Sequence, residues 1–417
     1  MSHETNTASA LAKDMTSLSQ QIRSLTQAIK SNRESLHSSS DAIKNAKQEL
    51  VDAAEALLAV AQPPDPLKTA MVAMVQLTTL HLFREWKVFD AIHEAGTISY
   101  ADLAEKLGAD VALISRFAAI LVATGVLADV GEDKITNTPS SLPFLSTSPM
   151  GAIIKMMQVN HWFQDHLLAL HAMPAYFEHY GLKEPTGRHH TVHAFAAGDA
   201  ELTVWEHLNR DPEKKKNMMA AMTAIVTRMP MTGSYNFSWV VAKGEASPDR
   251  VLVVDVGGGN GHALQAIGEV TPGLKLDKCA VEDLGPVVDE ARATAKGELA
   301  KAKYVPVDFH SEQPIQGACI YYIRRCLHDY GDDVSVEILQ HLRAAMADDS
   351  RVLIVEEVMQ DPPLPFAVAS DIYMATIGGK ERTLKNFEAI ASRSGLRIVK
   401  AHPSVGSDVA VIECAKI

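Results

Sequence analysis

The stretch Val251-Leu-Val-Val-Asp-Val-Gly-Gly-Gly-Asn-Gly261 is the most informative segment of this 417-residue chain. An apolar run, as in a buried strand, leads into four glycines at positions 257, 258, 259 and 261. Glycine lets backbone N–H groups at the start of the following helix approach a ligand closely. The dinucleotide fingerprint G-x-G-x-x-G would need Gly at position 262, where His262 stands. The stretch therefore predicts a strand–loop–helix unit that binds a ligand other than a dinucleotide.

Strand-like and helical segments alternate from Arg250 to the end of the chain. The strand-like runs cover residues 250–255, 274–281, 304–307, 318–323, 351–356, 396–400 and 409–414. Such alternation is typical of a doubly wound sheet with helices on both faces. We therefore expect an α/β domain of the Rossmann-like kind over residues 246–417.

Carboxylates lie at the ends of the first three predicted strands. Asp255 precedes the glycines, a pattern that suits a cationic amino-acid nucleoside better than a pyrophosphate. Asp283 ends the second strand, where a carboxylate can chelate both ribose hydroxyls. Asp308 and Phe309 end the third strand and suit an adenine amine and its ring face. In this order the residues predict a nucleoside site; the alternative is a purely structural domain.

Residues 63–150 have a helical pattern with a helix-turn-helix cadence. The runs Val126–Val130 and Lys134–Asn137 predict two short strands of a wing. Residues 70–145 hold five basic and nine acidic side chains, and the helix in the recognition position carries only Arg116 as a base. Phosphate contacts need several cations. We therefore expect a winged-helix-like domain that serves packing and binds no nucleic acid.

Residues 1–62 are rich in Ser, Ala, Gln and Lys and contain neither Gly nor Pro. Apolar residues spaced four and three apart form a heptad seam, which consists of Leu11, Met15, Leu18, Ile22, Leu25 and Ile29. A single narrow stripe cannot form a core alone. The segment predicts a helical arm that docks on the partner subunit of a homodimer, and a frayed polar arm is the alternative.

The overall composition excludes several classes of protein. The chain has 39 Lys and Arg against 51 Asp and Glu, a net charge of −12, which disfavours nucleic-acid and anionic-membrane binding. The sequence has no run of 18 apolar residues, so we expect no membrane-spanning helix. The polar first ten residues precede no apolar core, so we expect no secretory signal. The four cysteines form no CxxC pair, and nothing completes a metal set with His189, His190 and His193. We expect a cytoplasmic protein without a metal.

Residues from about 68 to 417 resemble the plant caffeic-acid-type and fungal polyketide O-methyltransferases. The resemblance is carried by ordered motifs, of which the last two are the most specific. They are Phe195-Ala-Ala-Gly, Val204-Trp-Glu-His-Leu, Asp211-Pro-Glu, Val254-Asp-Val-Gly-Gly-Gly-Asn-Gly, Glu282-Asp-Leu, Asp308-Phe, Arg325-Cys-Leu-His-Asp-Tyr330 and Gly378-Gly-Lys-Glu-Arg-Thr383. The resemblance implies a class I enzyme that depends on S-adenosylmethionine (SAM), with an N-terminal winged-helix dimerisation domain.

The resemblance also implies a set of site residues. The positions that match the family's SAM contacts are Gly257, Gly259, Asp283, Asp308, Phe309 and Arg324, where plant members usually have Lys at the last. The position of the catalytic base falls on His328, and the two carboxylates that orient it fall on Glu357 and Glu381. An imidazole near neutral pKa can take a phenol or enol proton, and carboxylates hold its tautomer.

Residues 151–245 predict long helices, which either line a substrate pocket or form an ordinary helical core. Flexible methionine side chains adapt to varied apolar ligands. The expected substrate-binding residues are His161, Trp162, Met222, Met229 and Thr232. Together with the base, they predict O-methylation of a small aromatic or enolic secondary metabolite of the polyketide or pyridone type.

Two other functions stay open at this point. Fungal pericyclases that resemble this family bind SAM without transferring methyl, and catalyse dehydration followed by Alder-ene or hetero-Diels–Alder cyclisation of a quinone methide. His161, the pair Arg324-Arg325, and Tyr330 in place of the usual Trp favour this alternative. Electrostatic stabilisation of developing charge would suffice for such chemistry. A non-catalytic SAM-binding regulator is the third interpretation.

Overall fold

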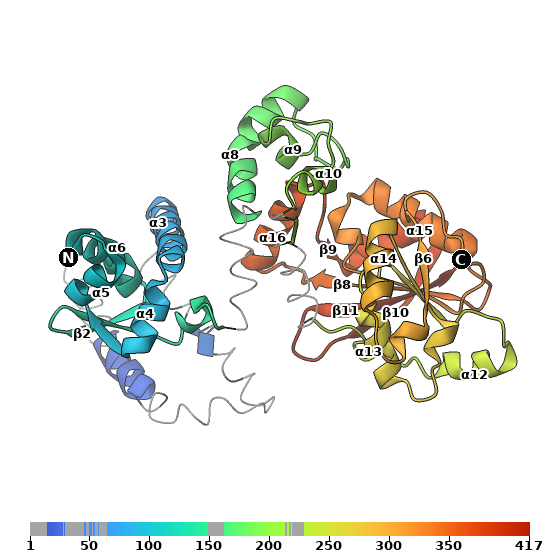
Figure 1. Ribbon diagram of the computed structural model, residues 1–417, viewed down its shortest axis with the longest axis horizontal. Coiled ribbons are helices and arrows are strands. Elements are labelled where there is room, and N and C mark those ends of the chain that lie inside the picture. The colour runs from blue at the N-terminus through green and yellow to red at the C-terminus, as the bar shows by residue number, and fades with distance from the viewer. Residues whose placement is uncertain are drawn as a thin grey trace, which may run out of the picture. The chain divides into compact units, whose positions relative to one another are not determined.

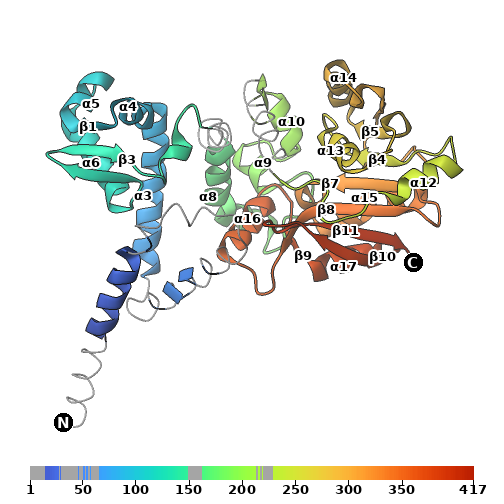
Figure 2. The same cartoon turned by 90° about the horizontal axis from the view of Figure 1, so that it is seen from below.

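The computed structural model describes residues 15–27, 29, 46, 50–51, 53–54, 57, 65–148, 162–212, 215–216, 218 and 229–417, and for residues 162–166 it describes the backbone alone. The chain divides into two compact units, Met1–Leu77 and Thr78–Ile417. Figures 1 and 2 show the helices and strands of each unit. The finer domain limits expected at residues 62, 150 and 245 stay predictions. Within the described residues, no helix has the length and apolar character needed to cross a membrane.

The first unit contains the predicted arm helix. Residues 15–27 are helical, and the part of the heptad seam within this helix is exposed, at Met15, Leu18, Ile22 and Leu25. Leu11 lies outside the described residues. The boundary between the units falls within helix α3 (Pro66–Glu85). The sequence prediction of a helix here is confirmed.

The winged domain follows the predicted order. Its remaining elements are α4 (Val88–Ala95), β1 (Thr97–Ser99), α5 (Tyr100–Leu107), α6 (Val111–Ala123), β2 (Leu127–Gly131), β3 (Lys134–Asn137) and a 3-10 turn, η2 (Leu142–Phe144). Local chemistry begins the two central helices: Ser99 Oγ accepts the N–H of Asp102, and Asp110 accepts the N–H of Ala112. The strands form an antiparallel sheet in the order β1-β3-β2, so the expected wing is confirmed.

Four helices precede the large sheet. They are α8 (Trp162–Tyr180), α9 (Val192–Ala196), α10 (Val204–Asn209) and α12 (Trp239–Ala246). Tyr176 of α8 and Val192 of α9 are buried in one small core. Threonine begins both short helices, and at α10 Thr203 and Glu206 form a reciprocal capping box.

The second unit contains a large sheet with strand order β10-β11-β8-β7-β4-β5-β6, and β9 pairs with β8. The strands are β4 (Val253–Val256), β5 (Ala280–Asp283), β6 (Lys303–Pro306), β7 (Ile320–Arg324), β8 (Arg351–Met359), β9 (Arg382–Thr383), β10 (Leu396–Pro403) and β11 (Val409–Lys416). The strands β6, β5, β4, β7 and β8 lie side by side in this order and are parallel. Strand β11 pairs antiparallel with both β8 and β10. The chain order reverses between β4 and β7, where α/β sheets bind ligands.

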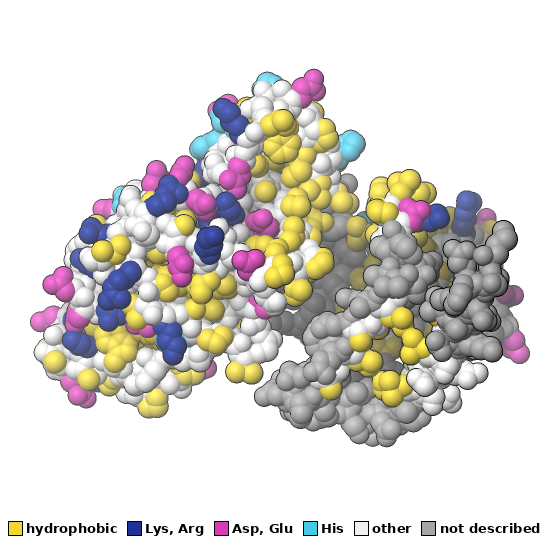
Figure 3. Space-filling model, turned by 180° about the vertical axis from the view of Figure 1, so that it is seen from behind, with side chains coloured by type: hydrophobic (Ala, Val, Ile, Leu, Met, Phe, Trp, Pro, Cys, Tyr) yellow, Lys and Arg dark blue, Asp and Glu magenta, His cyan; other side chains and the backbone are white. Residues whose placement is uncertain are grey.

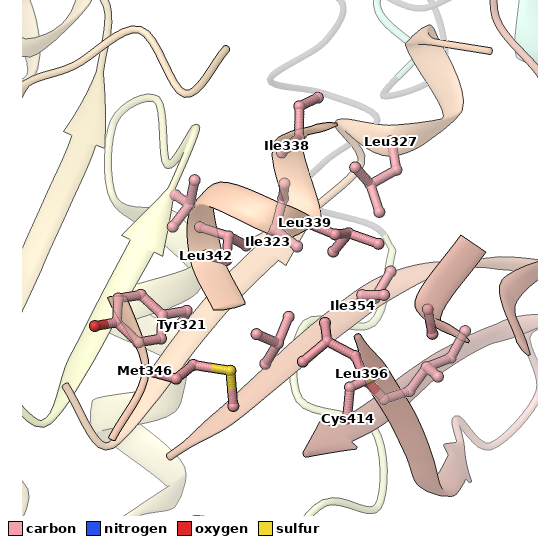
Figure 4. Packing of buried hydrophobic residues seen from close by; sticks show 14 of the residues in the cluster. Tyr321, Ile323, Leu327, Ile338, Leu339, Leu342, Met346, Ile354, Leu396 and Cys414 are labelled. Atoms are coloured by element: carbon pink, nitrogen blue, oxygen red, sulfur yellow. The ribbon is translucent and has the colours of Figure 1, made fainter. Parts of the chain in front are cut away.

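The helices of this domain alternate with the strands. They are α13 (His262–Val270), α14 (Gly285–Thr294), α15 (Asp332–Ala345), α16 (Pro365–Ala375) and α17 (Leu384–Arg393), with 3-10 turns η3 (Leu276–Lys278), η4 (Leu299–Lys301) and η5 (Leu327–Asp329). Alternate residues of β7 face opposite cores, because side chains of a strand alternate. Tyr321 and Ile323 pack on one face (Figure 4), and Ile320 and Tyr322 pack on the other.

The predicted strands appear in the expected order, but several differ in extent from those in the structure. The run expected over 274–281 forms η3 first and becomes β5 only at Ala280, because Leu276 packs into the helical layer against Gly268. The strand expected to end at Glu356 continues to Met359, and β9 was not predicted. Helix α16 has no buried residue, and its exposed hydrophobic side chains include Phe366 and Ile372. Figure 3 shows hydrophobic side chains in yellow among charged ones on one face of the protein.

Candidate active site

The glycine loop begins where β4 ends. Gly257 and Gly259 have φ values of 65° and 54°, in the left-handed region that favours glycine. A Cβ at Gly257 would lie 2.8 Å from Cys326 Sγ and 3.2 Å from Phe309 Cε1. A Cβ at Gly259 would meet nothing within 4 Å. The loop is therefore packed tightly beneath Gly257 and open beside Gly259, as a cradle for a ligand requires.

Asp283 lies against this loop from the end of β5. Its carboxylate accepts the N–H of Gly259 at 2.9 Å and the N–H of Leu284 at 2.8 Å. Burial raises the pKa of Asp283, and these two hydrogen bonds act in the opposite direction. The structure thus brings together two residues that the sequence assigned to one cofactor site.

Asp308 and Phe309 follow β6 at the same edge of the sheet. Asp308 Oδ1 accepts the N–H of His310 at 3.0 Å and stays exposed. The ring of Phe309 lies beneath Gly257 and edge-on to Tyr330, with 6.2 Å between ring centroids. Both residues therefore lie beside the glycine loop.

Two buried carboxylates lie below the cradle. Burial raises the pKa of Asp255 to about 7 and that of Glu282 to about 7. Gln313 donates to Glu282 at 2.7 Å. Within the described part of the chain, Asp255 Oδ2 and Glu282 Oε1 are buried and have no hydrogen-bond partner. Acceptor oxygens beneath an open, glycine-lined edge fit a ligand that carries a cation and a ribose, as SAM does.

The turn η5 holds His328 through its backbone. The N–H of Lys380 donates to the carbonyl oxygen of His328 at 2.8 Å. The buried guanidinium of Arg382 donates to the carbonyl oxygens of Leu327 and Tyr330 at 2.9 and 2.8 Å. A side chain at Gly379 would collide with the carbonyl oxygen of His328. The segment Gly378–Thr383 therefore packs against the turn η5 and holds it through these hydrogen bonds; we refer to this segment as the clamp.

The imidazole of His328 lies between two carboxylates. Its Nδ1 atom is 3.1 Å from Glu381 Oε1, and its Nε2 atom is 3.4 Å from Asp329 Oδ1. Burial and the Arg325 guanidinium lower the pKa of His328, but Asp329, Glu356 and Glu381 raise it further, so it lies above its usual value. Glu381 is also buried, yet its interaction with His328 holds its pKa below the ordinary value. The predicted pair His328 and Glu381 is thus in contact.

Glu357, which the resemblance implied as the second carboxylate that orients the base, lies beside Arg325. Among the described interactions, it contacts Arg325, with Oε2 at 3.9 Å from Nη1, and not the ring of His328. The neighbouring Glu356 was not predicted, yet its Oε1 accepts the N–H groups of Cys326 and Leu327 at 3.0 Å each. The only sequence signal for Glu356 was the carboxylate pair itself at the end of a strand.

The expected substrate-binding residues are placed only in part. His161 and Met222 lie outside the described residues, and Trp162 begins α8, with its side chain not described. The carbonyl oxygen of Met229 accepts from Arg324 Nη2 at 3.2 Å, and that of Thr232 accepts the N–H of Tyr235 at 3.2 Å. The segment 229–232 therefore lies beside the end of β7, next to the turn that carries His328.

Comparison with known proteins identifies the family. Residues 182–397 match the O-methyltransferase domain, and residues 68–147 match the O-methyltransferase dimerisation domain. The methyltransferase cfoD of Aspergillus candidus is 36% identical over 370 residues, which cover 87% of this chain and 90% of that protein.

Solved structures agree in fold. OxaC in complex with SAH and oxaline superposes with a TM-score of 0.76 at 25% identity and covers 95% of this chain and 98% of its own. LepI in complex with SAM has a TM-score of 0.78 at 22% identity, over 96% of this chain and 100% of its own, which shows a common fold. The resemblance drawn from the motifs is confirmed. The chain belongs to the SAM-dependent O-methyltransferase family.

Proposed function

We propose that the protein methylates a hydroxyl of a small aromatic or enolic secondary metabolite, of polyketide or pyridone type, with His328 as the general base. The observation that carries the proposal is the buried contact between His328 and Glu381, with 3.1 Å between Nδ1 and Oε1. A histidine held in this way, beside the cofactor loop, is what deprotonation of an acceptor requires.

The geometry of the sheet edge supports a set of proposed contacts to the cofactor. Asp283 would bind the ribose hydroxyls, because it lies at the carboxyl end of β5 against Gly259. Asp308 would accept from the adenine amine, and the ring of Phe309 would face the base. Arg324 holds the segment at Met229 and would shape the pocket wall. When bound, SAM supplies an electrophilic methyl group on a sulfonium.

The side chains around His328 would help it to accept and hold the proton of the acceptor's hydroxyl. With Nδ1–H donated to Glu381, the lone pair at Nε2 is available to the acceptor's hydroxyl. The imidazolium that forms would be stabilised by Glu381 and Asp329. Because the His328 side chain is only 11% exposed, water has little access to the acidic proton it then holds. Catalysis would combine deprotonation with positioning of the acceptor.

A second candidate is pericyclic chemistry with bound SAM and no methyl transfer. The observation that favours it is a guanidinium, Arg325, in the same buried cluster as His328. A fixed cation could polarise a quinone methide during cyclisation. In that case His328 would serve as one polar wall among several.

One experiment separates the two candidates. Purified protein is incubated with SAM and candidate polyketides or pyridones, and products are followed by mass spectrometry. A product heavier by one methylene, together with demethylated cofactor, supports the methyltransferase. An isomerised or dehydrated product with intact SAM contradicts it and supports the pericyclase. His328→Ala protein is the matched control for background chemistry.

We also propose that the protein acts as a homodimer. The match of residues 68–147 to the dimerisation domain supports this assembly. The exposed seam of the arm helix, at Leu18, Ile22 and Leu25, and the exposed Leu67 and Met71 of α3 are apolar surface that a second copy would cover.

A further inference from the structure

Arg325 has an unusual backbone conformation at the entrance to the active-site turn. Its φ is 55°, in the left-handed region that a residue with a long side chain rarely adopts. Its N–H still donates to the carbonyl oxygen of Val355 in β8 at 3.1 Å, so the left-handed residue directly follows the end of β7 and precedes the turn η5. Such an uncommon backbone conformation often occurs at a functional site, where it holds a side chain in a required position.

The side chain of Arg325 reaches two carboxylates of β8. Its Nη1 atom is buried and lies 3.9 Å from both Glu356 Oε2 and Glu357 Oε2. Glu356 in turn accepts the N–H groups of Cys326 and Leu327 through its other oxygen. The guanidinium is thus joined through Glu356 to the turn that ends at His328.

Charged groups face His328 from three parts of the chain. Asp329 and Arg325 come from the turn itself, Glu356 from β8 and Glu381 from the segment before β9. The carboxylates outnumber the cation, and each of them favours the protonated imidazole. Arg325 opposes them from within the cluster, and Glu356, Glu381, Glu357 and Asp329 all stabilise its charge.

We propose that Arg325 is a positioning residue that offsets the carboxylates Glu356 and Glu357 and so keeps the imidazole of His328 free to accept a proton. This role rests on the proposed function of His328 as the base. It also explains why a buried guanidinium occupies a strained turn, because a neutral side chain there would leave the carboxylates of β8 unopposed. Glu357 then acts on His328 through Arg325 and not by direct contact.

The test compares Arg325→Met with Arg325→Lys, which restores a charge, and with Arg393→Met, an exposed arginine of α17 paired with Asp333. Removal of a cation raises the pKa of a neighbouring histidine, so the acid limb of the kcat/KM profile should move to higher pH in Arg325→Met. A rise of about one unit gives roughly tenfold lower activity below the limb and near-normal activity above it. Arg325→Lys and Arg393→Met should keep the original profile.

A second readout does not depend on turnover. In full-length protein labelled at histidine, the His328 resonance, assigned by its loss in His328→Gln, should titrate at higher pH in Arg325→Met. An unchanged titration, or a loss of activity equal at every pH, would overturn the role of Arg325. If His328→Gln keeps full methyl transfer, the base itself is wrong, and the titration still reports whether Arg325 controls the imidazole.

Discussion

The Nδ1 atom of His328 and the Oε1 atom of Glu381 lie 3.1 Å apart, although 53 positions separate the two residues in the chain. A backbone hydrogen bond from Lys380 N–H to the His328 carbonyl oxygen joins the turn η5 to the segment before β9 and holds this contact. The active site therefore depends on two loops that fold against each other. Five predictions test this arrangement and its surroundings.

Replacement of the base should slow the reaction without weakening cofactor binding. We expect His328→Ala to lower kcat by about 10²–10⁴, the usual effect of losing a positioned general base. The affinity for SAM, measured by calorimetry, should stay the same, because in the proposed mechanism the imidazole faces the acceptor. The rate should recover in part at high pH, where the acceptor ionises unaided. A variant with full activity at neutral pH would contradict the proposed mechanism.

Loss of the negative charge at Glu381 should alter the pH profile in a defined direction. The carboxylate raises the pKa of His328. In Glu381→Gln that pKa should fall, so the acid limb of kcat/KM should move to lower pH. The plateau should also fall, because the imidazole becomes a weaker base, but by less than in His328→Ala. Glu357→Gln should shift the acid limb less, since Glu357 acts on the ring only through Arg325; an equal shift in both variants would refute the assignment.

Asp283 should contribute to cofactor affinity. Its carboxylate lies at the end of β5 against Gly259, where ribose hydroxyls would donate to it. Hydrogen bonds to a charged group contribute about 1.5–3 kcal/mol, so Asp283→Ala should weaken SAM binding roughly ten- to hundredfold. Isothermal calorimetry measures the change. Asp289→Ala on the exposed face of α14 is the control, and an unchanged affinity in Asp283→Ala would remove the ribose assignment.

Arg382 should be important for stability. It is fully buried, pairs with Asp332 at 2.9 Å, and donates to the carbonyl oxygens of Leu327 and Tyr330. Breaking a buried pair costs about 3–5 kcal/mol because it leaves polar groups uncompensated. Arg382→Met should lower the free energy of unfolding accordingly, measured by urea denaturation. The exposed pair of Arg393 should contribute far less, and equal losses in Arg382→Met and Arg393→Met would show that the clamp is unimportant.

Removal of residues 2–62 should weaken the dimer. The arm helix exposes the apolar side chains of Met15, Leu18, Ile22 and Leu25. Deletion of the arm removes this apolar surface and, with it, the contact that we expect the arm to make with the partner subunit. Light scattering over a dilution series should show dissociation at a higher protein concentration than in the full chain. Dimers of unchanged stability would mean that the winged domain alone forms the interface.

The sequence was sufficient for the sheet and its ligand edge. Apolar runs of strand length identify themselves locally, and Gly257 and Gly259 require their residue type because of a left-handed backbone. The order of Asp283 and Asp308 at successive strand ends places them at one edge, since parallel strands share a direction. Their position beside the loop needed no tertiary detail beyond that rule.

The charge network around His328 was decided by the tertiary structure. Residues 352–356 of β8 are all buried, so no alternation of polar and apolar residues indicates which carboxylate reaches which partner. Glu356 binds the turn, Glu357 lies near Arg325, and only Glu381 bonds to the imidazole. Those partners lie between 29 and 53 residues apart in the chain, and a periodic pattern cannot encode such contacts. These contacts arise because the turn η5, β8 and the segment before β9 pack together in the fold. That packing sets the distances between the buried charged side chains around His328.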